Sequence, residues 1–349
     1  MQVPVLVGLS GGVDSFVTAL MLQRQGYRVV GAHLRLWGNG DISGLEGLCK
    51  DLGIEWLHYD GRAEFRRLVV EPFVSEYVEG RTPNPCAWCN NSIKWNLLMR
   101  LADEAGIYHF ATGHYVRIGE YEGRPYLYKG IDPNKDQSYF LWGLGRDVLA
   151  RAMTPLGDYT KREVKEFAAE NGYEAVADRK ESMGICFLEG TDYRDFVARE
   201  AERNDLMASG DIRDRAGNVI GRHTGLLNYT VGQKRDMPVV NGQSYYVAEI
   251  DAVHCRIVAD LKHCLNASRI IIGGTSFIAE DEWRSPDIEV KVRGLGLNPP
   301  GYVKIEQLAD GNFLLNLSEP AWAVAPGQPV ALYRGERLIG GGIAVTAMN

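Results

Sequence analysis

Short apolar runs alternate with segments of helical periodicity over the first half of the chain. Runs of strand length lie at residues 3–8, 27–34, 56–59 and 108–112. Residues 16–25 carry a helical pattern that Gly26 ends, and residues 92–105 carry a second one. This alternation predicts βαβ units around a parallel sheet, extending from residue 1 to about residue 196.

The pattern changes after about residue 205. Short β-branched or aromatic stretches recur at close spacing, broken by Gly, Pro and Asn, and no long helical period follows. Stretches that fit strands lie at residues 245–250, 269–272, 288–293 and 329–333. We therefore expect an α/β domain at residues 1–204 and two small all-β, barrel-like domains at residues 205–273 and 274–349, divided near Gly273 and Gly274.

Composition narrows the class of protein. The chain has 349 residues, of which 45% are hydrophobic and 24% charged, as is typical of a soluble protein with two or three domains. No apolar run approaches the roughly 18 residues of a membrane-spanning helix. The first residues lack the basic region of a secretory signal. We expect a cytoplasmic protein with no membrane partner.

The net charge is compatible with a nucleic-acid partner, and the cysteine content is compatible with thiol chemistry. The net charge is −7, but nucleic-acid binding needs only a local basic face. Residues 210–235 hold five basic and two acidic side chains, an excess that is usually just solvated surface. Six cysteines do not make a disulfide scaffold in a chain of this length. Metal binding or a chemical role is the more useful hypothesis for them.

The loop Ser10-Gly11-Gly12-Val13-Asp14-Ser15 lies between a strand ending at Gly8 and a helix. Such a loop presents unpaired backbone N–H groups and the positive end of a helix dipole, so it predicts an anion site. Its spacing matches neither the Walker pattern nor the dinucleotide G-x-G-x-x-G. Asp14 would repel phosphates unless a divalent cation intervened, which predicts Mg²⁺. The alternative is a glycine-rich turn without a ligand.

Loops of this kind resemble those of the ATP-pyrophosphatase (PP-loop) superfamily. Its members adenylate a carbonyl oxygen and then displace AMP with a nucleophile, because an adenylate leaves far more readily than a carbonyl oxygen. The superfamily includes ammonia-using synthetases, argininosuccinate synthetase, lysidine synthetase and several tRNA sulfurtransferases. The loop alone does not choose among them.

Three cysteines stand apart from the rest. Cys86 and Cys89 lie in a Pro-rich loop just before the helix predicted at residues 92–105, and Cys186 lies in Gly184-Ile185-Cys186-Phe187. A thiol at a helix N-terminus has a lowered pKa, and Lys94 would lower it further, which favours a nucleophile or metal ligand.

Three interpretations of these thiols compete. Incidental thiols are the usual expectation for Cys49, Cys255 and Cys264, but a weak one for Cys-x-x-Cys. A structural zinc would need a fourth ligand, for which His114 could serve. Sulfur chemistry or an iron–sulfur cluster is the third interpretation, in which three thiolates leave one iron open to sulfide.

Several longer motifs resemble those of the tRNA-specific 2-thiouridylase family. They lie at residues 8–15, 80–85, 89–90, 111–115, 132–141 and 184–187, and residues 230–233 and 325–328 extend the resemblance into the β half. The resemblance covers nearly the whole chain. It implies a PP-loop catalytic domain followed by two β domains, the last of which contacts tRNA.

The implied activity is ATP-dependent replacement of the C2 oxygen of the wobble uridine, position 34 of certain tRNAs, by sulfur. The implied ATP contacts are Gly8, Leu9, Ser10, Gly11, Gly12, Val13, Asp14, Ser15, Leu34 and Gly113. The implied target-base contacts are Asn84, Pro85 and Cys86, and the implied tRNA contacts are His114, Lys135, Asp136, Gln137 and Gln328. Cys89 matches the catalytic nucleophile and Cys186 the persulfide carrier, with Asp14 serving adenylation.

One departure from the family concerns sulfur delivery. Many members have an aspartate where this chain has Cys86, which creates Cys86-x-x-Cys89 beside Cys186. In a persulfide mechanism, sulfur on Cys186 attacks the adenylated C2 and Cys89 resolves the product, leaving a disulfide. In a cluster mechanism, Cys86, Cys89 and Cys186 hold a 4Fe-4S centre that delivers sulfide; three thiolates suit this ligand count better. The sulfur donor is a cysteine desulfurase, a relay protein or free sulfide.

Two other interpretations stay open. A PP-loop ligase that uses an amine would not need the cysteines, and no glutaminase-sized extra domain is present. A catalytically inactive tRNA-binding protein would be expected to lose Asp14 or the loop glycines, all of which are intact. A second departure lies between Trp37 and Leu52, where the chain is shorter than the usual acidic insertion of the family.

Overall fold

A five-stranded parallel sheet forms the centre of the N-terminal domain. The computed structural model describes residues 2–40, 42–179, 184–294 and 298–349. The strands run in the order β3-β2-β1-β4-β7, and every neighbouring pair is parallel. Their bounds are β1 (Pro4–Gly8), β2 (Arg28–Arg35), β3 (Glu55–Asp60), β4 (His109–Ala111) and β7 (Ala152–Met153). The four strands predicted from the sequence are confirmed, and the two-residue β7 was not predicted.

Helices cover both faces of this sheet. Along β1 the side chains alternate: Leu6 packs with α6 on one face, while Val5 and Val7 pack with α1 and α2 on the other. The bounds of the covering helices are α1 (Val13–Arg24), α2 (Ser43–Leu52), α6 (Trp95–Glu104), α8 (Lys161–Glu170) and α9 (Glu174–Ala177). The β-strands therefore end among helices at one edge of the sheet, where ligands of parallel sheets bind.

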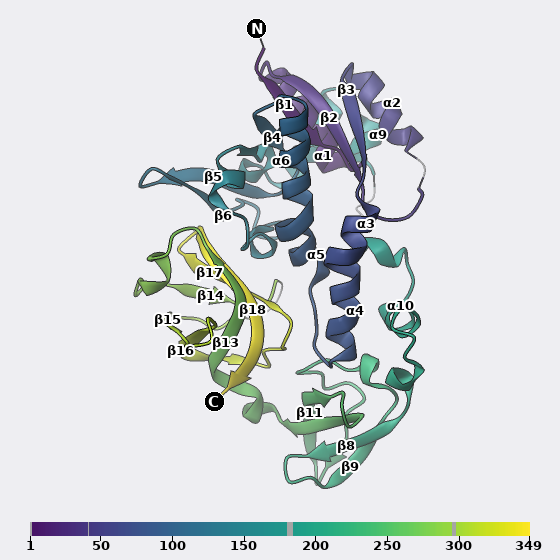
Figure 1. Cartoon of the computed structure of the whole chain (residues 1–349), viewed down its shortest axis with the longest axis vertical. Helices are drawn as coiled ribbons and strands as arrows, with labels where there is room; N and C mark the ends of the chain where they lie inside the picture. The colour runs from purple at the N-terminus through teal and green to yellow at the C-terminus, as the bar shows by residue number, and fades with distance from the viewer. Residues whose placement is uncertain (1, 41, 180–183, 295–297) are drawn as a thin grey trace.

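Two longer helical segments run from the sheet towards the β domains, the second of them beginning beside the sheet with α6 (Figure 1). The first comprises α3 (Arg62–Phe65), the π-helical turn η1 (Arg66–Val70) and α4 (Glu71–Val78). The second comprises α5 (Pro85–Trp88), the π-helical turn η2 (Cys89–Lys94) and α6. The helix predicted at residues 92–105 therefore begins earlier, at Pro85, and Cys86 and Cys89 lie within it. The remaining helices are α7 (Arg146–Leu149) and α10 (Tyr193–Glu200).

Short 3₁₀ turns connect many of the other elements. Their bounds are η3 (Ser138–Phe140), η4 (Pro155–Asp158), η5 (Cys186–Leu188), η6 (Asn204–Met207), η7 (Leu226–Asn228), η8 (Lys262–Leu265) and η9 (Glu282–Arg284). Cys186 thus begins a turn of its own. In the part of the chain that the structure describes, no helix combines the length and apolar character needed to span a membrane.

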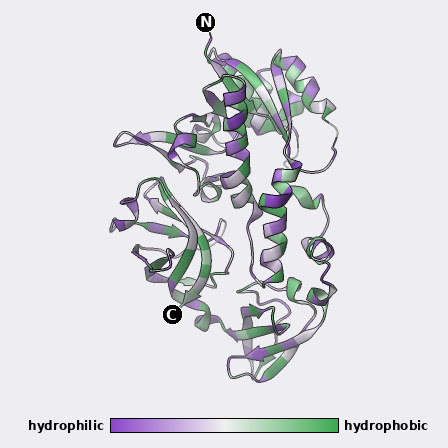
Figure 2. Cartoon of the chain, viewed as in Figure 1, coloured by the Kyte–Doolittle hydropathy of each residue, from purple (hydrophilic) through white to green (hydrophobic). Residues whose placement is uncertain are grey.

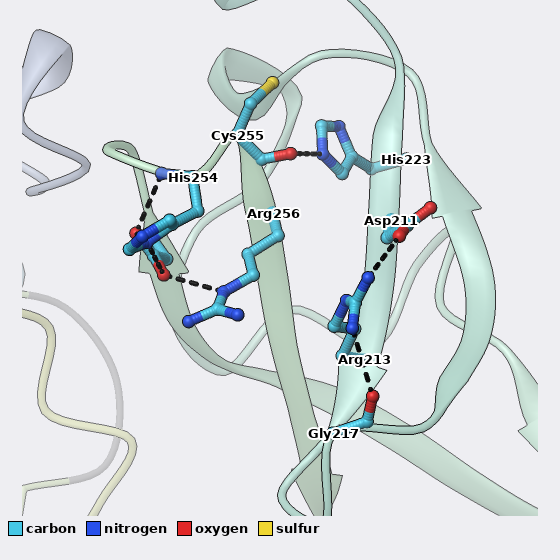
Figure 3. Close-up of polar contacts among 8 residues, drawn as sticks. Asp211, Arg213, Gly217, His223, His254, Cys255 and Arg256 are labelled. Carbon is cyan, nitrogen blue, oxygen red and sulfur yellow. Dashed lines mark hydrogen bonds and ion pairs between the residues drawn. The ribbon is translucent and has the colours of Figure 1, made fainter.

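The central β domain is a sheet of five strands in the order β10-β11-β12-β8-β9. Their bounds are β8 (Gly210–Asp214), β9 (Val219–His223), β10 (Val239–Val240), β11 (Gln243–Asp251) and β12 (Arg256–Leu261). The basic stretch at residues 210–235 lies here. Arg213 pairs with Asp211 at 2.9 Å, as Figure 3 shows, and Arg215 pairs with Asp260 at 3.1 Å. These pairs neutralise much of the predicted basic face.

The C-terminal β domain has its own sheet, ordered β14-β17-β18-β13-β16-β15. Its strands are β13 (Asn266–Phe277), β14 (Glu289–Lys291), β15 (Val303–Gln307), β16 (Phe313–Trp322), β17 (Pro329–Arg334) and β18 (Arg337–Met348). Figure 2 shows hydrophobic stretches along β13 and β18, whose inward residues fill the core. The expected boundary at Gly273 and Gly274 falls inside β13, which pairs with β18 on either side of it.

A hairpin from the N-terminal domain joins this C-terminal sheet. The hairpin comprises β5 (Val116–Tyr121) and β6 (Arg124–Lys129), and β6 pairs with β18 through Leu127 and Leu338. Buried Arg337 lies over the ring of Tyr126, and Tyr126 donates a hydrogen bond to Glu282. The first and last domains are therefore connected by strand pairing as well as by side-chain packing.

Candidate active site

The loop from residue 10 to residue 15 connects β1 to α1 in a form suited to an anion. Gly11 has φ +79°, a conformation that other residues rarely adopt, and no side chain caps α1 at Gly12. Ser15 Oγ donates to the Gly12 carbonyl at 3.0 Å and accepts from the Ser10 N–H at 3.2 Å. The first N–H groups of α1 are left for a ligand, as the sequence predicts.

Gly113, at the end of β4, lies directly against this loop. A Cβ atom at Gly113 would come within 2.9 Å of the Asp14 carbonyl carbon and 3.0 Å of the Ser15 nitrogen. Any side chain here would push the loop away from the sheet. The predicted ATP contact at Gly113 is therefore placed beside the loop, and its glycine has a steric reason.

Asp14 is held by two groups from distant parts of the chain. Tyr115 donates its hydroxyl hydrogen to Asp14 Oδ1 at 2.7 Å, and the Lys161 ammonium lies 2.7 Å from the same oxygen. Lys161 is the first residue of α8, where the helix dipole disfavours a cation, so its position needs a compensating anion. Because Lys161 pairs with Asp14, the protein itself offsets part of the repulsion between Asp14 and phosphate.

A cavity of about 570 Å³ opens beside the loop, at the carboxyl ends of β1, β2 and β4. Predicted ATP contacts line it: Gly8, Leu9, Ser10, Asp14, Ser15, Leu34 and Gly113. Three further lining residues come from the predicted tRNA and sulfur sites: His114, Gln137 and Cys186. Lys94 also lines the cavity. Gly11, Gly12, Val13, Cys86 and Cys89 are not in its lining. The structure thus brings Cys186 to the same cavity as the anion-binding loop.

His114 connects the sheet to the cysteine-bearing helix through hydrogen bonds. Asn90 donates through Nδ2 to the Cys86 carbonyl, so its Oδ1 accepts from His114 Nε2, 3.1 Å away. Thr112 Oγ1 lies 2.9 Å from Nδ1 and donates to it. Burial, together with the charge of Lys94, lowers the pKa of His114 to about 3, so the ring is neutral at pH 7. With both ring nitrogens engaged, His114 does not serve as a zinc ligand here.

The three thiols differ from the sequence-based expectation in acidity. Asn84 caps α5 by accepting from the Ala87 N–H, which places Cys86 in the first helical turn. Burial raises the pKa of Cys89 to about 11, and it also raises the pKa of Cys86 and of Cys186. The predicted lowering of these pKa values is therefore wrong, because the removal of water outweighs the helix terminus and Lys94.

The thiols nevertheless lie close to one another. The charge of Cys186 acts on both Cys86 and Cys89. Cys89 is 7% exposed, whereas Cys86 and Cys186 lie at the surface, where neighbouring protein atoms still exclude part of the water around their thiols. Among the residues that the structure describes, no three or more His, Cys, Asp or Glu side chains are placed to hold a metal ion. The arrangement as it stands does not fit the ligand set expected for an iron–sulfur cluster.

The loop before the cysteines is held by both β domains. Thr82 donates its N–H to the Pro326 carbonyl at 2.8 Å, and Gln328 Nε2 donates to the Thr82 carbonyl at 2.7 Å. A Cβ atom at Gly80, whose φ is +76°, would lie 2.6 Å from the Ile250 carbonyl in β11. Gln328, predicted to contact tRNA, therefore also joins the C-terminal domain to the approach of the cysteine helix.

The predicted tRNA contacts at residues 135–137 lie in a loop that its own side chains organise. Asp136 accepts through Oδ1 from the Gly130 and Ser138 N–H groups, both at 3.1 Å, and Gln137 Oε1 accepts from the Tyr115 N–H at 2.9 Å. The Lys135 N–H donates to the Asp132 carbonyl. Asp136 faces inward, so its role in this structure is to shape the loop.

Three families of known domains match consecutive parts of the chain. A tRNA methyl transferase HUP domain family matches residues 3–190, a tRNA methyl transferase PRC-barrel domain family matches residues 194–259, and an aminomethyltransferase beta-barrel domain family matches residues 267–344. A tRNA-specific 2-thiouridylase MnmA 3 from Bacteroides fragilis is 40% identical over 339 residues, covering 97% of this chain and 92% of the relative. The chain belongs to the tRNA-specific 2-thiouridylase family.

Another member of this family is similar over nearly its whole length. The 2-thiouridylase MnmA of Geobacter metallireducens is 37% identical over 363 residues, covering 99% of this chain and 97% of that protein. Among solved structures, a 4-thiouridine synthetase–RNA complex with bound ATP aligns with a TM-score of 0.39 at 16% identity, over 57% of this chain and 50% of that one. Membership in the 2-thiouridylase family confirms the resemblance and the fold class drawn from the motifs.

Tyr115 and Lys161 are site residues whose contacts with Asp14 the sequence motifs do not reveal. Tyr115 falls inside a matched motif, but nothing in its spacing reveals a bond to Asp14. Lys161 carries a weak signal, since Thr160-Lys161-Arg162-Glu163 is a capping box that places a lysine at the positive end of a helix. In this 2-thiouridylase, Lys161 lies where the helix dipole disfavours a cation, and it lies there because it pairs with Asp14 of the active site.

Proposed function

We propose that this chain is a tRNA-uridine 2-sulfurtransferase that uses ATP to activate the C2 oxygen of a uridine and then replaces that oxygen with sulfur. The observation that carries the proposal is the single cavity shared by the PP loop and Cys186. The adenylate bonds to the C2 oxygen and the sulfur attacks C2 itself. The PP loop and the sulfur-bearing cysteine are therefore needed in one cavity. The family resemblance points to the wobble uridine, position 34, as the target.

The loop and the Asp14–Lys161 pair serve adenylation in this proposal. Backbone N–H groups at the start of α1 bind the pyrophosphate part of ATP, and the predicted contacts at Leu34 and Gly113 flank the nucleotide. Asp14 and Ser15 fit a Mg²⁺ ion that keeps most of its ligands from phosphate and water, and such an ion would neutralise phosphate charge. Lys161 fixes Asp14 and adds a positive charge beside the leaving pyrophosphate.

Cys186 and Cys89 serve sulfur transfer. A persulfide on Cys186 attacks the adenylated C2 with its terminal sulfur, and the C2–O bond breaks as AMP leaves with the bonding electrons. The Cys89 thiolate then attacks Cys186 Sγ, the bond between Cys186 and the transferred sulfur breaks, and 2-thiouridine leaves a Cys89–Cys186 disulfide. A dithiol reductant must restore the thiols, and a cysteine desulfurase, relay protein or free sulfide must resupply sulfur.

The cluster mechanism is the competing account of sulfur delivery. It needs Cys86, Cys89 and Cys186 as three ligands of a 4Fe-4S centre, and it predicts bound iron and absorbance near roughly 400 nm in anaerobic protein. The two mechanisms differ at Cys86. In the persulfide mechanism, Cys86→Ser keeps thiolation within about threefold of wild type, whereas loss of thiolation together with loss of bound iron would favour the cluster.

The proposed tRNA contacts rest on the family resemblance. Asn84, Pro85 and Cys86 form the exposed start of α5, where the target base is proposed to bind. The remaining proposed tRNA contacts are His114, Lys135, Asp136, Gln137 and Gln328. The C-terminal β domain, which we place from Asn266 onwards because β13 begins there, would contact the tRNA, and the enzyme would act in the cytoplasm.

Mass spectrometry of nucleosides from treated tRNA tests the function. Cys186→Ser should release AMP and pyrophosphate but form no 2-thiouridine, while Cys264→Ser, a matched control outside the cavity, should thiolate normally. An amine-using ligase would be indifferent to Cys186→Ser, and an inactive tRNA-binding protein would release no pyrophosphate with either variant. Normal thiolation by Cys186→Ser would refute the assigned role of Cys186.

A further inference from the structure

Lys94 occupies the place where the phosphate loop and the thiols meet. It is the last residue of the π-helical turn η2, which follows directly from Cys89. Its side chain lines the cavity together with Ser10 and Asp14 of the loop and with Cys186. Because π-helical turns are rare and often accompany functional sites, the turn that ends at Lys94 itself indicates a functional position.

The ammonium of Lys94 has no counter-ion within the described ranges of the chain. Lys161, which lies at the phosphate loop but not in the lining of the cavity, is already paired with Asp14 at 2.7 Å. Glu189, the remaining carboxylate in the lining, forms no ion pair with Lys94 among the described residues. A half-buried cation without a partner is unfavourable in the free protein, so this arrangement suits an anion that arrives with the substrate.

Electrostatic effects show how far the charge of Lys94 reaches. It lowers the pKa of Cys86, Cys89 and Cys186 against the larger upward effect of burial. It also adds to the lowering of the pKa of His114. One unpaired positive charge therefore acts on all three thiols and also lies in the nucleotide cavity. No other described side chain combines these two positions.

We propose that Lys94 is a catalytic residue that binds the phosphate joining adenosine to the activated uridine. This inference rests on the proposed function, because it assigns Lys94 to the adenylated intermediate of that reaction. When sulfur bonds to C2, the C2–O bond breaks and its electron pair moves onto the phosphate oxygen of AMP. The Lys94 ammonium offsets that developing negative charge, and it offsets the charge on the same phosphate while pyrophosphate leaves.

The test compares Lys94→Met with Lys94→Arg and with Lys50→Met, a matched change on the exposed side of α2. ATP affinity, tRNA affinity, single-turnover pyrophosphate release and 2-thiouridine formation are measured for each. We expect Lys94→Met to bind ATP and tRNA within about threefold of wild type but to thiolate about 100-fold more slowly. Lys94→Arg should recover a large part of the rate, and Lys50→Met should behave as wild type.

Two results would overturn the proposal. One is wild-type thiolation by Lys94→Met. The other is a loss of rate that matches a loss of ATP or tRNA affinity, with no recovery in Lys94→Arg, because that pattern indicates a structural role. Failure of the proposed function looks different, since the wild-type enzyme itself would then form no 2-thiouridine with ATP, tRNA and a sulfur source.

Discussion

The ammonium of Lys161 lies 2.7 Å from Oδ1 of Asp14, although 147 residues separate them in the chain. The pair places a cation at the phosphate loop without the glycine–lysine motif that P-loop enzymes use. It also fixes the Asp14 carboxylate, which accepts a second hydrogen bond from Tyr115. We therefore expect adenylation, as proposed above, to depend on this contact between α1 and α8.

Replacing Lys161 tests this dependence. Lys161→Met leaves Asp14 charged and unneutralised beside the phosphates, so we expect pyrophosphate release to slow by about 100-fold. Stopped-flow detection of pyrophosphate measures this directly. Lys165→Met, a change in the same helix, is the matched control and should release pyrophosphate at the wild-type rate. Equal rates for Lys161→Met and wild type would remove Lys161 from the mechanism.

His114 gives the fold a pH dependence of known sign. The pKa of His114 falls from the ordinary 6.5 to about 3 in the folded protein. Between these two pH values the unfolded chain therefore binds a proton at His114 that the folded chain does not bind. The stability contributed by neutral His114 is complete above about pH 6.5 and is lost as the pH falls towards 3. From pH 7.5 to pH 5 this single group should cost about 2 kcal/mol of the free energy of unfolding.

Urea denaturation at the two pH values checks the contribution of His114. In His114→Gln the free energy of unfolding should fall by about 2 kcal/mol less than in wild type over the same interval. His263→Gln is the control, because His263 lies exposed and has no carboxylate partner among the described residues. Parallel pH profiles for wild type and His114→Gln would show that His114 is not held neutral.

Gln328 should control the mobility of the loop before the cysteines. Gln328→Ala removes the hydrogen bond to the Thr82 carbonyl, which should cost about 1 kcal/mol and loosen the neighbouring Thr82 N–H. Hydrogen–deuterium exchange of the peptide containing Thr82 is the measurement, and faster exchange is expected. Gln243→Ala, on an exposed strand end, should leave that peptide unchanged. Unchanged exchange in Gln328→Ala would mean that Pro326 alone holds the loop.

Local features were predictable from the sequence because their causes are local. The strand, glycine loop and helix around Asp14 follow from hydrophobic period and glycine placement, and the structure confirms each. The approach of Cys186 to the loop could be inferred only from the family resemblance, since no periodic pattern connects residue 186 to residue 10. Strand pairing between Leu127 and Leu338 likewise joins parts of the chain that sequence patterns treat separately.

The acidity of the thiols shows where sequence reasoning fails. A helix terminus and Lys94 are visible in the sequence, and both favour a thiolate. The burial of Cys89 is not visible, because it depends on packing against segments such as α4 and residue Phe187. Burial has the larger effect, so the pKa of Cys89 rises. Pairwise effects can be read from spacing, but desolvation requires the tertiary structure.

The central claim is that the C2 oxygen of uridine leaves as part of AMP, and isotope transfer tests it most directly. A tRNA carrying ¹⁸O at C2 of the target uridine is treated with ATP, a sulfur source and the wild-type enzyme, and AMP is analysed by mass spectrometry. The account predicts one ¹⁸O in the phosphate of AMP for each 2-thiouridine formed. Formation of 2-thiouridine with unlabelled AMP would contradict it.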